Sequence, residues 1–445
     1  MHLFLNPSKN QTTYFSILFA AFPVSFIAGN MIININTILI ILSAFFIFKI
    51  NNFSLKFFIE DKLIFLFFIL VFFSSVSADF FFYTNKLFHE TSHGLGYLAT
   101  SIKSLFFLKY LFLYISIKIL IENKVLNLKY FFISCTICSL FVSIDIIIQL
   151  VFGKDVFGYE IIEGSRKLGG PFGEELIAGG YIQRFSLFTF FVLPIFFNLE
   201  KIKKITFFFL PILFVLFSIS IILAGNRINL ILFLMIVFLI LISHKQLRKF
   251  FLHFTLIFVV VFTLLFNFNS EIKNNFRNFY GSVTSMISIS LIEDKKTRPL
   301  SHFQEFSTFY ETWLMHKYIG GGIKNFRYFC HKRPVKNEQK QYACNMHPHN
   351  YYLEILTETG VFGLVIILSI FIITFYKTFY KKYITRSSLK ENKLIIPFIF
   401  LFIAEIFPIK STGSFFTTGN TTYIFLILAI LLALTRNDNS IENKP

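Results

Sequence analysis

The sequence predicts an all-α polytopic membrane protein. Apolar residues fill 55% of its 445 positions and charged residues only 15%, and the mean hydropathy is +0.67. Soluble domains carry about a quarter charged residues, so this composition excludes an ordinary soluble fold. The repeated apolar runs suit helices across a hydrocarbon core of about 30 Å, each of which needs roughly 20 residues. They lack the period-2 alternation of outer-membrane strands, which leaves helices.

The apolar runs and their boundaries predict twelve membrane-spanning helices within a single membrane domain, residues 1–445. The longest connection is predicted to be a large exterior loop, residues 269–350, between the ninth and tenth helices. The predicted helices are 13–30, 31–49, 62–79, 103–121, 130–152, 179–198, 205–223, 226–243, 250–268, 351–376, 394–409 and 420–435.

The distribution of Lys and Arg predicts the orientation. With the N-terminus inside, the inner connections hold 21 of these residues and the short outer ones hold 7. Short cytoplasmic connections are enriched in Lys and Arg, so both termini are predicted to be cytoplasmic. The formal net charge is +18, and the basic residues that produce it lie in short clusters between apolar runs, which is typical of topology signals. The expected partner is therefore the lipid bilayer, and no nucleic acid is expected.

The 269–350 loop has about 80 residues, which is marginal for an independent core without a covalent staple. Cys330 and Cys344 lie in this loop, 14 positions apart. Outside the cell membrane they could form a disulfide, worth about 3 kcal/mol in the chain-entropy estimate. The spacing is equally compatible with two unpaired thiols.

The stretch HPHNYYLEILTETGVFG begins at His347 and leads into the predicted helix 351–376. His349 stands just before that helix, and Asn350 begins the helical pattern. The positive end of a helix dipole disfavours the protonated imidazole, so His349 suits the role of a neutral general base. The alternative is that both histidines only supply interfacial polarity. A metal site with Glu354 lacks a clear third ligand at helix spacing, so no metal is predicted.

Glu354 and Glu358 are one helical turn apart. They could orient a histidine or bind hydroxyl groups, but a water-facing stripe of the helix is the favoured interpretation. Gly360 and Gly363 are predicted to be mainly structural and to allow close helix approach.

Three arginines are candidates for binding an anion. Arg227 begins a predicted helix and could anchor it at the interface or present a guanidinium fork to a phosphate. Arg166 precedes a Gly-rich segment whose backbone could form an anion nest or merely turn. Arg184 lies about one and a half turns into the predicted helix 179–198, where it must face protein or water rather than lipid.

Four segments resemble, in order, motifs of the O-antigen ligase and O-antigen polymerase family of bacterial membrane glycosyltransferases. His349 begins a His-Asn-x9-Gly-x-x-Gly pattern. Upstream, RKLGGPFGEELIAGGYIQRF resembles the family's Gly-Pro-Phe-Gly segment, LAGNRINL its Ser-Arg-Gly helix start, and YIGGGIKNF its Gly-rich loop segment. The resemblance covers about residues 130 to 425. Asn226 and Asn229 depart from the family pattern of small residues, which puts close packing around Arg227 in doubt.

The resemblance implies a metal-independent, inverting glycosyltransferase without a cofactor in the bacterial inner membrane. Its donor would be a glycan on undecaprenyl diphosphate, used at the periplasmic face with part of the active site on the 269–350 loop. His349 matches the proposed base, with His347, Asn350 and Glu354 in support. Arg227 matches the helix-start arginine and Arg166 the basic residue before the glycine turn, and with Arg184 they would bind the diphosphate.

The acceptor distinguishes three versions of this enzyme. A ligase transfers the glycan to the lipid A core, a polymerase transfers it to another lipid-linked repeat, and a protein O-oligosaccharyltransferase transfers it to a protein hydroxyl. Two alternatives of another class are a polysaccharide or lipid transporter and a scaffold that binds partners through the long loop. A transporter often shows an internal repeat, which this sequence lacks.

Overall fold

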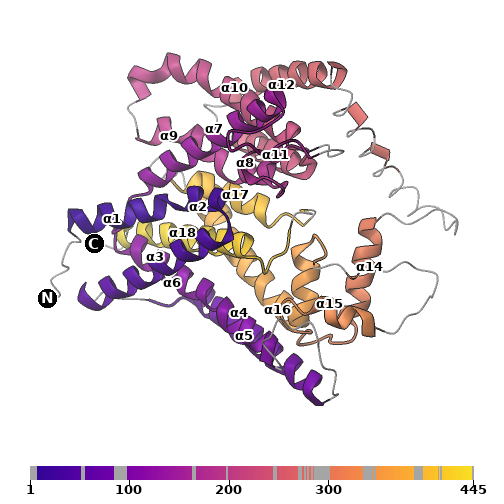
Figure 1. The fold of residues 1–445 in the computed structure, drawn as a ribbon. Coiled ribbons are helices and arrows are strands. Elements are labelled where there is room, and N and C mark those ends of the chain that lie inside the picture. The colour runs from indigo at the N-terminus through magenta and orange to yellow at the C-terminus, as the bar shows by residue number, and fades with distance from the viewer. Residues whose placement is uncertain are drawn as a thin grey trace. The chain divides into compact units, whose positions relative to one another are not determined.

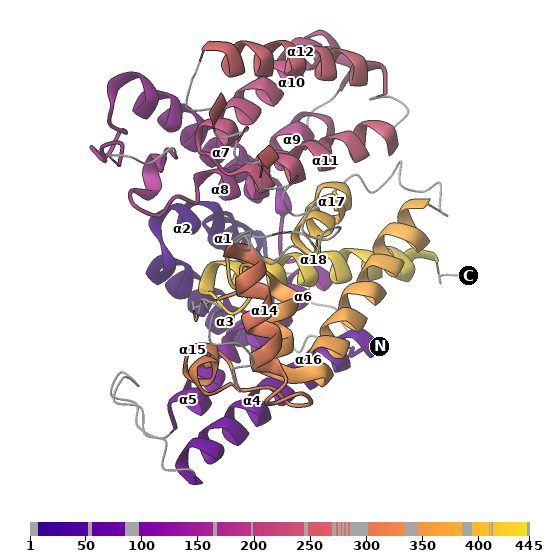
Figure 2. The ribbon, with the colours of Figure 1, turned by 90° about the vertical axis from the view of Figure 1, so that its right-hand side faces the viewer.

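The computed structural model describes residues 8–51, 56–84, 98–162, 167–196, 199–243, 248–268, 301–333, 347–384, 394–408 and 413–442, with residues 344 and 410 and short pieces between 273 and 284. Every regular element in this part of the chain is a helix (Figure 1; Figure 2). The chain divides into two compact units, and the boundary falls within α3 (Asn30–Asn51). The first unit comprises residues 1–36, 124–295 and 390–405, and the second comprises 37–123, 296–389 and 406–445.

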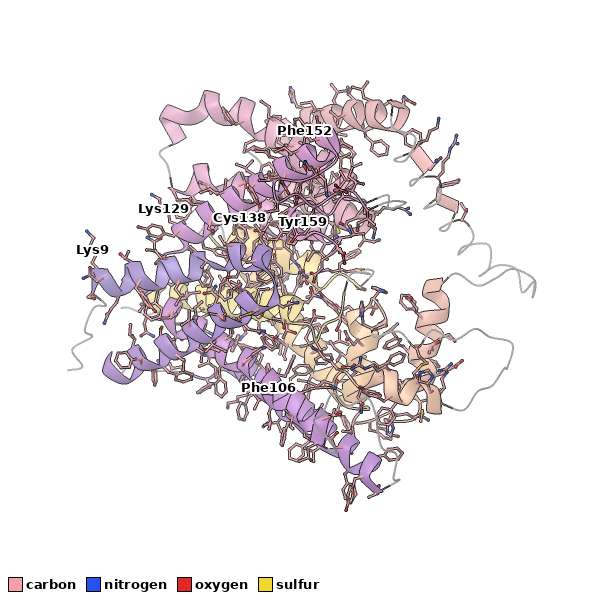
Figure 3. All side chains as sticks on the ribbon, in the orientation of Figure 1. Lys9, Phe106, Lys129, Cys138, Phe152 and Tyr159 are labelled. Atoms are coloured by element: carbon pink, nitrogen blue, oxygen red, sulfur yellow. A yellow bond between two sulfur atoms is a disulfide. The ribbon has the colours of Figure 1, made fainter. Side chains whose placement is uncertain are left out.

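The first unit is organised around α7, which contacts α1, α2, α8, α9 and α10. The side chain of Asn127 caps the start of α7 by accepting from the Lys129 N–H at 3.0 Å, and Gly153 ends it with φ of 78°. Cys135 and Cys138 are buried free thiols on this helix, as expected of small apolar filler, and Figure 3 labels Cys138. The helices of this unit are α1 (Lys9–Ala20), α2 (Phe22–Ala28), α7 (Leu128–Phe152), η2 (Gly170–Phe172), α8 (Ala178–Phe185), η3 (Ser186–Phe188), α9 (Thr189–Phe196), α10 (Leu199–Leu223), α11 (Arg227–Ser243), α12 (Arg248–Phe268) and α17 (Ile395–Glu405).

The second unit is built on two helix pairs, α4 with α16 and α6 with α18. The predicted exterior loop contributes α14, α15 and η4, and α14 packs on α16 (Figure 1). Phe106 projects outward from α5 with 70% of its surface exposed (Figure 3), as expected of a lipid-facing side chain. The helices of this unit are α4 (Ile59–Thr84), α5 (Ala99–Phe107), α6 (Lys109–Glu122), α14 (Ser301–Trp313), α15 (Phe326–Phe329), η4 (Cys330–Lys332), α16 (Tyr351–Phe375), η5 (Tyr376–Ile384) and α18 (Thr418–Glu442).

Seven helices in the described residues are long and apolar enough to cross a membrane. They correspond to predicted helices and are Lys9–Ala28, Asn30–Phe48, Ile59–Phe81, Ala99–Glu122, Leu128–Phe152, Tyr351–Tyr380 and Thr418–Arg436. Four further predicted helices appear as shorter apolar helices, Phe209–Leu223, Arg227–Ile242, His253–Leu264 and Ile395–Glu405.

The predicted helix 179–198 differs from the structure. This stretch is divided among α8, the 3-10 turn η3 and α9. The division falls after Gln183 and Arg184, polar residues in the middle of an apolar run, and Arg184 pairs with a side chain on α17. The predicted span is therefore helical from Ala178 to Phe196, but a 3-10 turn interrupts it.

Candidate functional site

The start of α16 holds the two histidines that the sequence singles out. Asn350 caps the helix, and its Oδ1 accepts from the N–H groups of Tyr352 at 3.0 Å and Leu353 at 3.1 Å. His349 precedes the cap with φ of 52°, in the left-handed region that non-glycine residues seldom adopt. The rings of His347 and His349 lie 4.4 Å apart, and both residues are half-buried. A strained backbone conformation of this kind is concentrated at functional sites.

Burial lowers the pKa of His347 below its ordinary value, and the charge of His349 lowers it further. Glu305 acts in the opposite direction but more weakly. His347 is therefore kept neutral beside His349. Within the described residues, no group of three His, Cys, Asp or Glu side chains is arranged to hold a metal ion.

Contacts with the chain after α17 hold the start of α16 in place. Asn350 donates from Nδ2 to the Pro408 carbonyl at 3.0 Å, and the Tyr352 hydroxyl donates to the Ile406 carbonyl. The Glu354 carboxylate accepts from the Ser414 hydroxyl and from the Phe415 N–H. These contacts fix the backbone on which His349 is carried.

The prediction that Glu354 and Glu358 form a water-facing stripe is wrong. Each side chain is only 1% exposed. Glu354 turns inward because Ser414 and Phe415 supply it with donors, and Glu358 interacts with the backbone and the charge of Lys324. Sequence spacing places two residues on one face of a helix but does not say what covers that face.

A disulfide joins Cys330 to Cys344, whose Cα atoms are 5.7 Å apart. Arg333 donates from Nη1 to the Cys330 carbonyl, and its Nε pairs with Glu311 on α14 at 3.3 Å. Cys344 lies three residues before His347. The crosslink therefore tethers the chain just ahead of both histidines to the folded part of the loop.

α16 is broken at Gly360, where φ is 71° and ψ is −172°. The Gly-rich segment 317–322 occupies the break through four backbone hydrogen bonds of 2.9 to 3.3 Å, which join Gly321 to Thr357, Gly322 to Glu358, Val361 to Lys317 and Phe362 to Tyr318. A Cβ on Gly360 would lie 2.1 Å from the Tyr318 carbonyl oxygen, and one on Gly320 would lie 2.4 Å from the backbone of Glu358. At Gly360 the close approach is thus of a loop rather than of a second helix, whereas a Cβ on Gly363 would lie 3.5 Å from Leu70 of α4, as the predicted helix approach requires.

The segment that follows these glycines brings three cationic side chains together, which the sequence interpretation missed. Lys103 on α5 and Arg327 on α15 both lie over the ring of Tyr328, with 5.8 Å from Nζ and 5.0 Å from Cζ to the ring centroid. Lys103 also interacts electrostatically with Lys324, whose side chain is exposed. Lys103 was counted only among the outer Lys and Arg residues that predict the orientation, although the Gly-rich motif YIGGGIKNF itself contains Lys324 and ends directly before Arg327.

Arg227 is the first residue of α11, in the first unit, and is half-buried. The preceding Asn226 bonds to both sides of the α8 start, accepting from the Gly179 N–H at 3.1 Å and donating to the Leu176 carbonyl at 3.3 Å. A Cβ on Gly179 would lie 2.7 Å from Asn226, and one on Gly180 would lie 3.3 Å from Asn229. The glycines of α8 make room for both asparagines, so the close packing that was in doubt is present.

The other two arginines of the sequence interpretation have different outcomes. Arg184 pairs with Glu405 of α17 through Nη2 at 2.7 Å and Nε at 3.2 Å, so it faces protein. Arg166 lies outside the described residues.

The turn after Arg166 uses its backbone donors internally. The N–H groups of Gly170 and Gly173 bond to Gln149 at 2.9 Å and to the Gly170 carbonyl at 3.2 Å. This arrangement favours a structural turn over an open anion nest.

These features define an all-helical polytopic membrane protein in which a strained histidine precedes a broken membrane helix. Residues 212–368 match the family described as O-Antigen ligase, which confirms the family that the sequence motifs indicated. The matched region includes Arg227, the Gly-rich loop segment and His349. No match was found among curated proteins.

Proposed function

We propose that this protein is an O-antigen ligase-like glycosyltransferase of the bacterial inner membrane, with both termini in the cytoplasm. It moves a glycan from undecaprenyl diphosphate to a lipid A core acceptor at the periplasmic face. The observation that carries the proposal is His349, held in a left-handed conformation directly before the cap of α16 and inside the matched family region.

The chemistry follows from the donor. A sugar diphosphate already carries its leaving group, so the protein must remove a proton from the acceptor hydroxyl and neutralise charge on the departing diphosphate. His349 accepts the proton from the acceptor hydroxyl, whose oxygen forms a new bond to the anomeric carbon as the bond to the diphosphate breaks. Attack from the side opposite the diphosphate inverts the anomeric centre without a metal or cofactor.

Charge on the leaving diphosphate is assigned to Arg227, with Arg166 in support. Arg184 contributes less, because Glu405 already pairs with its guanidinium group. Arg227 begins α11 at the position where the positive end of the helix dipole adds to its own charge.

The test compares His349→Asn with His349→Ala. Asparagine tolerates the left-handed conformation, so His349→Asn should insert and fold normally yet lose transfer by a factor of about 100 or more, the usual contribution of a general base. Glycan transfer is measured in membranes supplied with donor and acceptor, and His331→Asn, on the exposed side of η4, is the control. Retained transfer in either His349 variant would refute the assignment.

A gene deletion distinguishes the acceptors. Long glycan that is made but not attached to lipid A supports the ligase. A single repeat on the core indicates the polymerase, and unchanged lipopolysaccharide with unglycosylated protein indicates the protein O-oligosaccharyltransferase.

A further inference from the structure

Three cationic residues near Tyr328, which are Lys103, Lys324 and Arg327, lie on segments that pack tightly against one another. Gly322 donates its N–H to the Ser74 hydroxyl at 3.2 Å, and a Cβ on it would lie 2.7 Å from Thr100. The loop therefore docks on α4 and α5 with no room for a larger residue. This contact brings Tyr328 and Arg327 to the same place as Lys103, and all of them belong to the second unit.

The positive charge at this place is not balanced by direct ion pairs. In the described part of the chain, no carboxylate lies within ion-pairing distance of Lys103, Lys324 or Arg327. The Nε of Arg327 is buried and has no acceptor among the described residues. Lys103 and Arg327 are half-buried, and Lys324 is exposed beside them. Holding like charges together in a partly desolvated place is costly, so an oxyanion bound here would relieve their repulsion and satisfy open donors.

The nearby carboxylates of the protein do not neutralise these three cations by direct ion pairs. Asp79 is used by the start of α5, where it accepts from Thr100 N at 3.2 Å and Ser101 N at 2.7 Å. Glu354 is used by Ser414 and Phe415. Glu358 interacts electrostatically with both Lys103 and Lys324, Asp79 interacts with Lys103, and Glu354 interacts with Lys324. None of these three carboxylates lies within ion-pairing distance of the cations.

We propose that Lys103, Lys324 and Arg327 bind an acidic group, a phosphate or a carboxylate, on the acceptor glycan. The guanidinium fork of Arg327 suits two oxygens of one oxyanion, and the lysines add point charges from α5 and from the loop.

The choice of acceptor over donor rests on the proposed function, because His349 must touch the acceptor hydroxyl and belongs to this same unit. Lys324 interacts with Glu354, whose N–H bonds to the Asn350 carbonyl at 3.1 Å, one residue after His349. The donor diphosphate has its own arginine in Arg227.

The experiment measures equilibrium binding to the purified full-length protein in nanodiscs. The probes are a core oligosaccharide released from lipopolysaccharide, the same oligosaccharide after dephosphorylation or after carboxyl reduction, and inorganic diphosphate. The wild-type protein should bind the untreated oligosaccharide about tenfold more tightly than one of the two treated forms, as expected for a charge-assisted contact. The treatment that lowers affinity identifies the acidic group.

The double variant Lys103→Gln/Arg327→Gln should lose this preference while binding inorganic diphosphate as the wild-type protein does. Lys324→Gln, at an exposed side chain, should weaken the preference without risk to folding, and Arg327→Lys should retain most of it. Lys317→Gln, on the exposed part of the same loop, is the matched control.

An unchanged preference in the double variant and in Lys324→Gln would overturn the proposal. Weakened diphosphate binding would also overturn it, because the cluster would then serve the donor. The binding preference is measured without donor and without transfer, so retained transfer in the His349 variants would refute the proposed base and leave this preference in place. A failure of the proposed catalytic function is therefore distinguishable from a failure of this site.

Discussion

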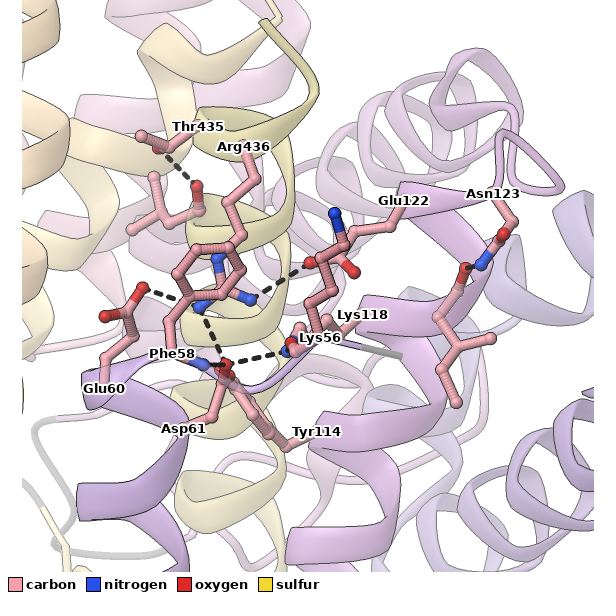
Figure 4. A network of polar contacts seen from close by, with 12 residues as sticks. Lys56, Phe58, Glu60, Asp61, Tyr114, Lys118, Glu122, Asn123, Thr435 and Arg436 are labelled. Carbon is pink, nitrogen blue, oxygen red and sulfur yellow. Dashed lines mark hydrogen bonds and ion pairs between the residues drawn. The ribbon is translucent and has the colours of Figure 1, made fainter. Parts of the chain in front are cut away.

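The two ends of α4 carry buried charge in opposite arrangements. At its start, Glu60 and Asp61 lie in a network that includes Arg436 of α18 and Lys118 of α6 (Figure 4). At its end, Asp79 only caps α5, and the cations around Tyr328 have no direct ion pair in the described part of the chain. One end is neutralised by the protein itself, and the other leaves charge for a ligand.

The network at the start of α4 shows what a purely structural use of charge requires. Arg436 donates to Glu60 at 2.6 Å, to Asp61 at 3.0 Å and to Glu122 at 3.0 Å. Lys118 donates to Asp61 at 2.8 Å, and both side chains are 1% exposed. Each carboxylate in this network has a cation within hydrogen-bond distance. The network therefore joins α4, α6 and α18 without need of another molecule.

The largest expected effect comes from Arg436→Ala. Removing Arg436 takes a donor from three carboxylates, although Glu60 keeps Lys377 and Asp61 keeps Lys118 as partners. The loss should therefore lie at the lower end of the cost of breaking a buried pair, about 3 kcal/mol of stability. Arg327→Ala should cost less than about 1 kcal/mol, because only an aromatic contact is lost. Thermal unfolding of both purified variants, followed by fluorescence-detected size exclusion, measures the difference. Equal losses of stability in the two variants would contradict the view that charge is structural at the start of α4 and binds a ligand at its end.

A second prediction concerns Gly360→Ala, which tests whether the break in α16 holds the loop that carries Lys324 and Arg327 at the end of α4. The added Cβ would lie 2.1 Å from the Tyr318 carbonyl oxygen at φ of 71°. Backbone strain and overpacking together should cost about 3 kcal/mol and displace the 317–328 loop. Gly153→Ala is the matched control, because its φ is 78° but nothing lies within 4 Å of the added Cβ. It should cost only about 1 to 2 kcal/mol.

The readouts of this pair are thermal stability and proteolysis of the loop. Gly360→Ala should expose the loop to protease, and Gly153→Ala should leave it protected. Equal protection in both variants would show that the loop is held by contacts other than the break in α16.

The sequence predicted the helices well because hydropathy is a local property. Seven long apolar helices lie where the apolar runs placed them. The division of 179–198 and the break at Gly360 were not predicted, because both depend on partners distant in the chain. Arg184 meets Glu405, and Gly360 meets Tyr318.

A short motif was enough to single out His349, which lies in a strained conformation before the Asn350 cap. Its role as a base stays a prediction. No pattern showed that Lys103 would meet Arg327, because these residues are more than 200 positions apart and nothing in one sequence links them. A lysine among topology signals is indistinguishable from a ligand-binding lysine until its neighbours are known.

The smallest expected effect is an acid sensitivity at the end of α4. His316 packs against Phe81 at 5.3 Å and Phe329 at 4.4 Å between ring centroids, and burial lowers its pKa from the ordinary value of 6.5. The unfolded chain then binds more protons than the folded one below about pH 6.5, so stability falls as pH falls through the lowered pKa. Above pH 6.5 no effect is expected. His316→Phe should flatten this part of the stability profile, and the exposed His331→Phe should leave it unchanged.

Stability measured as a function of pH also tests whether the acid sensitivity of His316 is linked to the positive charge of Lys103 and Arg327. Tyr328 packs in the same cluster as Phe81 and Phe329, the two rings that His316 contacts. A proton on His316 therefore adds positive charge to the cluster in which Lys103 and Arg327 lie over the Tyr328 ring. An acidic oligosaccharide bound to those cations should offset the added charge and reduce the loss of stability in acid, whereas a neutral oligosaccharide should not. Stability curves from pH 7.5 to 5 with each oligosaccharide provide the comparison. Identical curves would show that the positive charge at this end of α4 does not act on a ligand.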